Sequence, residues 1–574
     1  MFACGQSNPE DPGEAVTSPG FRVNRSPPCL MVLALAFQHV LVQSSMQVLV
    51  VGGVLQEREE MEKVLTPVFF YSGLSTLLQS CLGTRLPLIQ APSVEFMIPA
   101  MALLFVRTEN NVTCRGHCEE TRESVIRGYP LRELQGMVVV AGLVQLAVGL
   151  TGIGGAVQRG FGPMVIAPVL CMLGFSVYRE AAILCSYHWG FAMLTVVLLV
   201  FFSQHLRSCV IPACLRLPVY PVCRMLSVLL SVSLVWGLCA SLEHWGHIYF
   251  YPLYELHPGM KVSNTTPTLV LNDTNVIAPS AWFSFPLSGS GLPLLSGPAI
   301  AAGVAAALSV SISSQCVYML TARLLDSPPP PAAATNRGLC AEGLGSVLAG
   351  LMGAPVGVCS SVANACSLGL SQCGSRSTVQ VAGALLLIVG VSPKLAHLLT
   401  CIPLAIHGAV LSVTYTVAVG TGITYFQYTH MDSGRNIFNI GFTVFMALVL
   451  PRWCRLQAGL ISTGVPSIDV ILQSFMTLPI FLVGLLAFVL DHTVSGSLME
   501  RGLDRNENTK EVWSLANRQQ GQSHTLEAVY EPPYLVKKFL NLPGLRVIPF
   551  CACRKPEGQE VVATPQEISS LLSV

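Results

Sequence analysis

Residues 85–99 read RLPLIQAPSVEFMIP, and residues 353–364 read GAPVGVCSSVAN. Both segments are apolar, but prolines interrupt the first, and glycine and proline interrupt the second. Proline lacks a backbone N–H and clashes with the preceding helical turn, so neither segment can be one unbroken helix. Irregular backbone survives at membrane depth only where protein buries it or where it lines a cavity. The pair therefore predicts a binding site between two broken helices. The alternative is that each segment is only a kink between packed helices.

The composition around these segments is that of a membrane protein. Of 574 residues, 52% are hydrophobic and 11% are charged, with a mean hydropathy of +0.59, whereas soluble domains are about a quarter charged. Lys and Arg number 32 against 31 Asp and Glu, for a net charge of +1. No positive excess remains to neutralise a phosphate backbone, so a nucleic-acid polymer is not expected as a partner.

Fourteen apolar runs are predicted to cross the lipid bilayer, in two sets of seven. The first set lies near residues 30–55, 66–82, 86–106, 135–153, 159–178, 185–205 and 220–243, and the second near residues 298–325, 338–353, 355–369, 377–392, 396–421, 436–451 and 468–490. An odd number of spans per half gives the second half the opposite orientation in the membrane. The predicted fold is an all-α polytopic membrane protein with 14 transmembrane segments as a 7+7 inverted repeat.

The loops suggest an orientation for these spans. If the polar N-terminus is cytoplasmic, the loops with glycosylation sequons at Asn111, Asn264 and Asn272 lie outside, and the tail after residue 490 lies inside. Arginines support this only in part, because they occur in predicted inner and outer loops alike. In the first outer loop, Cys114 and Cys118 either form a local disulfide or stay free. The plasma membrane is the expected location.

A series of motifs, in one fixed order, resembles those of a known family. They are Gln38-His39, Gly83 to Pro87, Pro328–Pro331 followed by Asn336-Arg337-Gly338, residues 432–438, Ser462-Thr463-Gly464 and residues 490–503. Over roughly residues 30–503 the chain resembles the nucleobase-ascorbate transporter family, solute carrier family twenty-three of vertebrates. Residues 90–96 and 343–350 are most similar to its divergent third vertebrate branch.

The resemblance implies a core domain that moves like an elevator against a gate domain, within a homodimer. It also implies a nucleobase or ascorbate bound between spans three and ten, with a glutamate from span eight. The corresponding divisions are residues 1–29 (disordered cytoplasmic N-terminus), 30–153 and 298–392 (core domain), 159–243 and 396–490 (gate domain), 244–297 (extracellular loop) and 491–574 (cytoplasmic tail).

The sequence departs from the family pattern where the solute is expected to bind. The span-eight pattern Glu-Ser-Ile-Gly-Asp falls on residues 313–317, which read SSQCV, so both acids are missing. Of the span-ten signature only Asn364 remains, and no Asp or Glu occurs in residues 274–325 or 343–431. Sodium sites favour oxygen ligands that often include a carboxylate, and proton coupling needs a titratable group. We therefore predict weak or absent ion coupling, which leaves facilitated diffusion or exchange.

The expected coupling bears on the expected solute. Ascorbate is an anion, and moving it against a negative membrane potential costs about 2.3 kcal/mol per charge per 100 mV unless cations accompany it. A neutral purine nucleobase such as hypoxanthine or xanthine has no such cost. The sequence therefore favours a neutral nucleobase that pairs with backbone N–H groups and with Ser313, Gln315 and Asn364.

The candidate substrate-binding residues come from spans three, eight and ten. They are Ser93, Glu95, Phe96, Ser313, Gln315, Ala363 and Asn364, with Gln38 and His39 supporting the core. Glu95 either replaces the lost span-eight carboxylate or bonds local backbone or water. Phe96 either stacks on a base or fills the core, and His39 either orders the core by hydrogen bonding to span eight or has a purely structural role.

Two other functions remain open. One is a sodium-dependent carrier of ascorbate or a nucleobase, and the other is a non-transporting relative with a regulatory role. An enzyme is not expected, because no acid–base pair, nucleophile elbow or metal cluster stands out. The histidines lack metal-ligand spacing, so neither a metal nor a cofactor is predicted.

Overall fold

The computed structural model describes residues 23, 26–55, 58–113, 123–209, 220–246, 282–286, 291–457, 462–497, 499–502 and 529–532. The first half contains α1 (Cys29–Val54), α2 (Arg58–Cys81), β1 (Gln90–Pro92), α3 (Val94–Thr113), α4 (Glu123–Thr151), α5 (Ile153–Arg159), α6 (Pro163–Phe175), α7 (Tyr178–Ser186), α8 (Trp189–Val200), the π-helix η1 (Phe201–His205), α9 (Val222–Met225) and α10 (Ser227–His244). The second half contains α11 (Gly297–Leu324), α12 (Ala332–Leu351), β2 (Val358–Ser360), α13 (Val362–Ser371), α14 (Arg376–Val391), α15 (Pro393–Thr400), α16 (Leu404–Tyr425), the 3₁₀-helix η3 (Phe426–Tyr428), α17 (Gly434–Leu456), α18 (Pro466–Thr477) and α19 (Pro479–Thr493).

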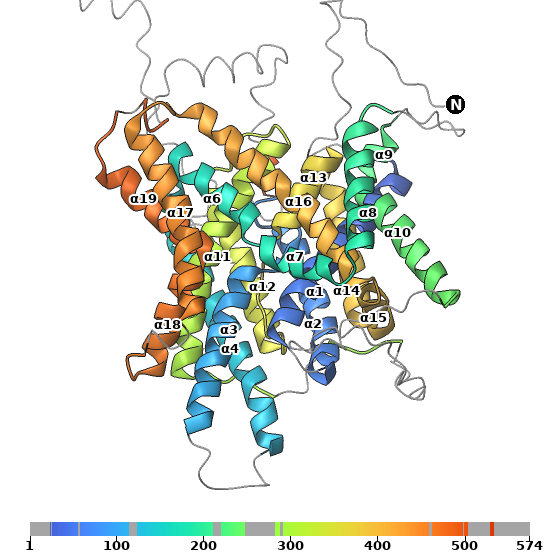
Figure 1. The fold of residues 1–574 in the computed structure, drawn as a ribbon, viewed down its shortest axis with the longest axis horizontal. Helices are drawn as coiled ribbons and strands as arrows, with labels where there is room; N and C mark the ends of the chain where they lie inside the picture. Colours follow the sequence, from blue (N-terminus) through green and yellow to red (C-terminus); the bar gives the residue numbers. More distant parts are fainter. Residues whose placement is uncertain are drawn as a thin grey trace, which may run out of the picture.

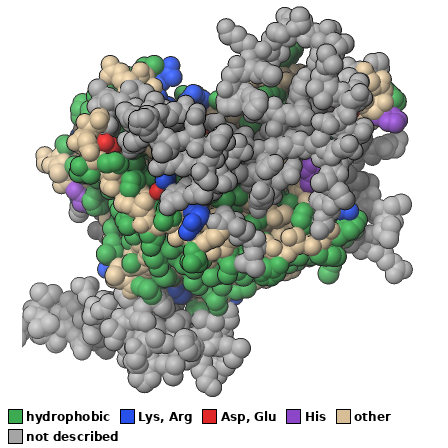
Figure 2. Space-filling model, turned by 90° about the horizontal axis from the view of Figure 1, so that it is seen from below, with side chains coloured by type: hydrophobic (Ala, Val, Ile, Leu, Met, Phe, Trp, Pro, Cys, Tyr) green, Lys and Arg blue, Asp and Glu red, His purple; other side chains and the backbone are tan. Residues whose placement is uncertain are grey.

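The predicted all-α membrane fold is confirmed in its class. Among the described residues, seven helices are long and apolar enough to cross a membrane, or nine if two sharply bent helix pairs each count as one span. A helix lies in each of the fourteen predicted segments, but fourteen crossings remain a prediction. Hydrophobic side chains cover much of the described surface in Figure 2, with few charged groups among them.

The sequence misplaced two helix breaks near prolines. Segment 468–490 was expected to be one helix, but α18 and α19 meet at Pro479 with a bend of 76°. A single span was expected over 396–421, but α15 ends at Thr400 and α16 begins only at Leu404, whereas the 105° bend between α14 and α15 lies in the predicted gap after residue 392. Both breaks follow from proline, which removes the amide that would continue the helical hydrogen bonding.

The two interrupted segments meet at the centre of the fold, as their sequences indicate. β1 pairs antiparallel with β2, with Gln90 opposite Ser360 and Pro92 opposite Val358. Each strand leads into a helix, β1 into α3 and β2 into α13. The first turns of α3 and α13 therefore begin beside this strand pair, where their backbone N–H groups are free of helical partners.

Helices from the two halves of the chain interleave in space. In a first group, α12 packs along α4, α14 packs along α2, and α11 packs against α3 and α4. In a second group, α16 packs against α6, α7 and α8, and α19 packs against α17. α11 and α12 lie between α17–α19 on one side and α1, α2 and α14 on the other (Figure 1). α1 and α13 both contact α16, so the two groups meet there.

Glycines allow α4 and α12 to approach at backbone contact. A Cβ added at Gly343 would lie 2.6 Å from the amide nitrogen of Leu146 and 2.7 Å from the carbonyl of Gly142, and one at Gly142 would lie 2.7 Å from the carbonyl of Gly343. Small residues at helix contacts are how membrane helices pack closely without a hydrophobic driving force between them. This seam positions Glu342, the residue that precedes Gly343.

Replacing Gly343 with alanine is expected to lower the melting midpoint of the purified protein. The added methyl group forces two backbones apart, and overpacking of this kind costs about 1–3 kcal/mol. Gly420→Ala in α16 is the matched control, because a Cβ there meets nothing within 4 Å. Equal midpoints for the two variants would contradict a tight α4–α12 seam.

Motifs that are distant in the sequence meet at one end of α17 and α19. The buried carboxylate of Asp491 accepts hydrogen bonds from Arg435 at 2.9 Å and from Arg501 at 3.0 Å. The hydroxyl of Ser433 donates to Glu500 at 2.9 Å, and the same carboxylate also accepts from the backbone N–H of Ser497. These bonds hold the pKa of Glu500 below its usual value, so the group stays ionised at neutral pH.

Candidate functional site

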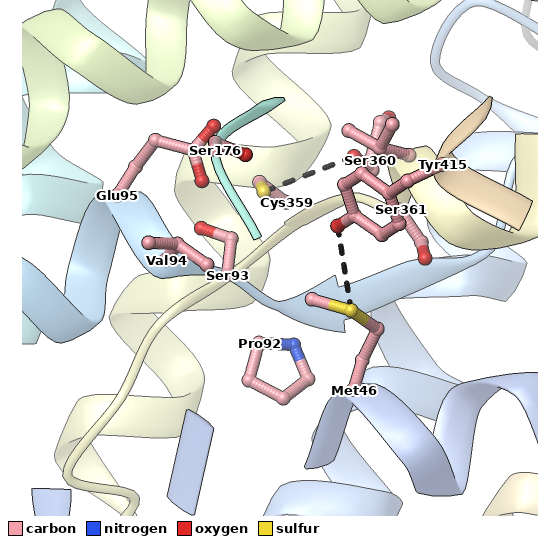
Figure 3. A pocket seen from close by; sticks show the side chains of 11 residues that line it. Met46, Pro92, Ser93, Val94, Glu95, Ser176, Cys359, Ser360, Ser361 and Tyr415 are labelled. Atoms are coloured by element: carbon pink, nitrogen blue, oxygen red, sulfur yellow. Dashed lines mark hydrogen bonds between the residues drawn. The ribbon is translucent and has the colours of Figure 1, made fainter. Parts of the chain in front are cut away.

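A small pocket lies where the strand pair meets α1 and α16. The empty space among its lining residues is about 280 Å³, which includes open solvent. Residues 92–95 and 359–362 form its walls together with Met46, Ser176 and Tyr415. Ser93 and Glu95 face the pocket from the start of α3, and Tyr415 faces it from α16 (Figure 3).

The carboxylate of Glu95 is the charged group of this pocket. Its side chain is 4% exposed, and it makes no hydrogen bond or ion pair with any described residue. None of the eleven lining residues is Lys, Arg or His. A buried carboxylate without a partner loses hydration that nothing replaces, unless a bound solute donates to it.

A second buried acid, Glu342 of α12, lies behind the pocket wall. Its side chain is fully buried, and its two oxygens accept five hydrogen bonds. The donors are Ser314 at 2.6 Å and Gln145 at 2.9 Å on Oε2, and Ser360 at 2.5 Å, Tyr318 at 2.7 Å and Gln90 at 3.5 Å on Oε1. These residues come from α11, α4, β2 and β1, so one carboxylate holds four elements together.

Ser360 connects this cluster with the pocket. Its hydroxyl donates to Glu342 and accepts from the side-chain amide of Gln90 at 3.0 Å, while the residue itself lines the pocket. Gln90 and Ser360 are also paired across the two strands. The position of the pocket wall therefore depends on the side chain of Glu342.

Asn364 and His39 fasten α13 to α1. The Nδ1 of His39 lies 3.0 Å from the Oδ1 of Asn364 and 3.4 Å from the hydroxyl of Ser367. The side-chain amide of Asn364 donates to Gln43 at 3.4 Å and to Ser361 at 3.1 Å. The prediction that His39 bonds span eight is wrong, because its partners lie on α13.

Two polar links join α1 to α16 beside the pocket. The hydroxyl of Tyr415 lies 3.4 Å from the sulfur of Met46, and Ser45 lies 2.9 Å from the Nδ1 of His407. Gln38, also in α1, accepts a hydrogen bond from the N–H of Leu229 in α10 and donates one to the carbonyl of Met225 in α9.

The predicted binding residues separate into two groups. Ser93 and Glu95 line the pocket. Phe96, Ser313, Gln315, Ala363 and Asn364 are buried outside its lining. Phe96 packs against Gly357, where an added Cβ would lie 2.3 Å from the ring, and against the alanines of α11. The roles of these residues in binding stay predictions.

The predicted modification sites lie at or beyond the edge of the described residues. Asn111 falls in the last turn of α3. Asn264, Asn272, Cys114 and Cys118 lie outside the described residues. Within the described ranges, no group of three or more His, Cys, Asp or Glu side chains is placed to hold a metal.

The residues that sequence reasoning missed are Glu342 and its donors. The acid-free stretch that suggested weak ion coupling begins at Gly343, one residue after this carboxylate. An ionisable residue in an otherwise apolar helix was the available signal, because such residues are costly in membranes and mark function. Glu95 is therefore not the only acid close to the strand pair, although spans eight and ten still supply none.

Comparisons with known proteins agree on one family. Residues 30–456 match a family described as the permease family. The chain is 40% identical over 514 residues to solute carrier family 23 member 3 of Mus musculus, across 86% of this chain and 80% of that protein. It is 29% identical over 556 residues to solute carrier family 23 member 1 of Mus musculus, across 92% and 88%. It is 26% identical over 441 residues to nucleobase-ascorbate transporter 2 of Arabidopsis thaliana, across 75% and 79%.

Proposed function

Because this chain belongs to the permease family and, within it, to solute carrier family 23, we propose that it carries a neutral purine nucleobase across a membrane. A relative is named as a nucleobase-ascorbate transporter, so two solute classes need to be separated. The observation that carries the choice is the buried, unpartnered carboxylate of Glu95 in a pocket lined by no Lys, Arg or His.

The charge of the pocket favours a neutral solute over an anion. An anionic ascorbate would face Glu95 with a like charge and without a lining cation to offset it. A purine such as hypoxanthine or xanthine offers ring N–H donors, which a carboxylate accepts. A hydrogen bond to a charged group contributes about 1.5–3 kcal/mol, enough to orient a small solute.

The second acid supports sodium-independent transport. A carboxylate has about four lone-pair sites, and Glu342 already accepts five hydrogen bonds. A cation would have to displace these donors from a fully buried side chain. We therefore propose facilitated diffusion or exchange rather than coupling to sodium.

We further propose that residues 30–153 and 298–392 form a core domain that moves like an elevator against a gate domain of residues 159–243 and 396–490. Support comes from the contact of α1 with α16, which has two polar links, while Gln38 of α1 and Leu370 of α13 add bonds to the segment of residues 222–229. A homodimer in the plasma membrane with cytoplasmic termini completes this proposal. Ile437, Phe438 and Phe445 of α17 are each more than half exposed and present an apolar face to lipid or to a second copy.

Uptake of radiolabelled hypoxanthine, uracil and ascorbate in one expression system tests this function. We expect saturable hypoxanthine uptake that is unchanged when choline replaces sodium, and no ascorbate uptake. Sodium-dependent ascorbate or nucleobase uptake would instead establish the coupled carrier. No uptake of any solute, with the protein delivered to the cell surface, would leave the non-transporting relative.

A further inference from the structure

Three arginines from separate parts of the chain converge at one end of the core helices. Arg85 lies in the loop between α2 and β1, Arg337 lies in the second turn of α12, and Arg376 is the first residue of α14. Residues 529–532 of the C-terminal tail lie against them. We call Arg85, Arg337 and Arg376 the arginine seat.

The arginine seat binds three successive main-chain carbonyls of the tail, and each arginine donates a hydrogen bond to one of them. The Nη2 of Arg376 donates to the carbonyl of Val529 at 3.0 Å, and the Nη2 of Arg337 donates to that of Tyr530 at 2.6 Å. The Nη1 of Arg85 donates to the carbonyl of Glu531. Such bonds bind main chain rather than side chain, because every residue carries the same acceptor.

The side chain of Tyr530 adds specificity to this backbone contact. Its ring is buried, with 5% of the residue exposed, and its hydroxyl donates to the carbonyl of Pro328 at 2.6 Å. Burial raises the pKa of Tyr530, so the hydroxyl remains protonated and keeps its donor. Tyrosine supplies both an apolar ring for burial and a hydroxyl donor for this carbonyl.

The same arginines also hold the loop that leads into the pocket. The Nε of Arg337 donates to the carbonyl of Gly83 at 3.3 Å, and the Nε of Arg376 donates to that of Arg85 at 2.9 Å. Arg85 itself has a left-handed backbone, with φ of 63°, which a non-glycine residue adopts only at a cost. β1, whose last residue lines the pocket, begins five residues later at Gln90.

We infer that the arginine seat is an intramolecular docking site for residues 529–532, and that the docked tail stabilises the loop of residues 83–86 in front of β1. Each of Arg337 and Arg376 bridges a tail carbonyl to a loop carbonyl, so loss of the tail removes one of the bonds that hold each guanidinium. The loop of residues 83–86 is then held by fewer hydrogen bonds, and its backbone amides become exposed to solvent more often through local opening.

Cleavage by the glutamate-specific protease Glu-C after Glu527, two residues before Val529, measures docking in the purified full-length protein, because the protease must also engage residues 529–531 to cut there. Wild-type protein is expected to resist cleavage there, with cleavage after Glu557 as the reference for protease activity. Tyr530→Phe loses one neutral hydrogen bond and should be cut about 2- to 12-fold faster. Tyr530→Ala also loses the buried ring and should be cut faster still. Equal cleavage rates in wild type and Tyr530→Ala would overturn the docking site.

Hydrogen exchange of the same proteins measures the effect on the loop. Amides of residues 83–88 are expected to exchange faster in Tyr530→Ala than in wild type, while amides of α17 keep their rates. Faster cleavage with unchanged loop exchange would overturn the coupling to the loop. Neither readout needs a solute, so failure of this inference is distinct from failure of the proposed transport.

Discussion

Replacing Glu342 with leucine is expected to prevent stable folding of the protein. Five buried donors lose their acceptor at once, and each unsatisfied donor costs about 1–3 kcal/mol. Even the lower value sums to about 5 kcal/mol, which is comparable with the whole stability of many domains. The loss should appear in thermal melting followed by size-exclusion chromatography of detergent-solubilised protein, as a large drop in midpoint or absence of a monodisperse peak.

Two further variants serve as comparisons: one separates charge from shape at Glu342, and the other is a control at a remote position. Glu342→Gln keeps the shape but turns one acceptor into a donor that faces other donors, so we expect an intermediate loss. Glu243→Leu makes the same chemical change at an exposed position near the end of α10 and should leave the midpoint unchanged. A Glu342→Leu protein as stable as wild type would show that the five donors find other acceptors, and the cluster would then not hold the fold.

Replacing Glu95 with alanine is expected to raise the KM for hypoxanthine about 10- to 150-fold. This is the loss of one hydrogen bond to a charged group, about 1.5–3 kcal/mol. The melting midpoint should not fall, because no described residue bonds to this carboxylate. Initial uptake rates, normalised to biotinylated surface protein, give the KM, and Glu243→Gln serves as the remote control.

The glutamine variant at the same site tests selectivity. Glu95→Gln removes the negative charge but keeps a carbonyl acceptor, so hypoxanthine uptake should fall less than in Glu95→Ala. Ascorbate should at the same time become a better inhibitor of hypoxanthine uptake, because the like charge is gone. An unchanged KM in both variants would place the carboxylate away from the solute and remove the main support for a neutral substrate.

Features that depend on the local chain were predictable from sequence. The broken segments were recognised from Pro87, Pro92 and Pro355, since proline restricts the backbone wherever it lies. Apolar runs located the helices because the length of a span follows from the thickness of the bilayer, which is again a property of the local chain. The breaks at Pro403 and Pro479 were equally local, and the long apolar runs around them concealed both.

Features that depend on distant helices were not predictable in this way. The partners of Glu342 come from positions up to 252 residues away, and no spacing in the sequence brings Gln90 to it. One alternative for His39, in the first span, was a hydrogen bond to span eight, but its partner Asn364 lies on α13, 325 positions further along the chain. Only the approach of whole helices, such as that of α4 to α12 through their glycines, decides which polar groups meet.

The pairing of β1 with β2 also sets an order of events during biosynthesis. Gln90 meets Ser360 across 270 positions of chain, which a ribosome adds in about 14 to 54 s at roughly 5–20 residues per second. During that interval the nascent first half has no β2 to complete its strand, and Gln90 lacks the acid of α12. The pocket beside this strand pair can therefore be assembled only after the second half of the chain has been translated.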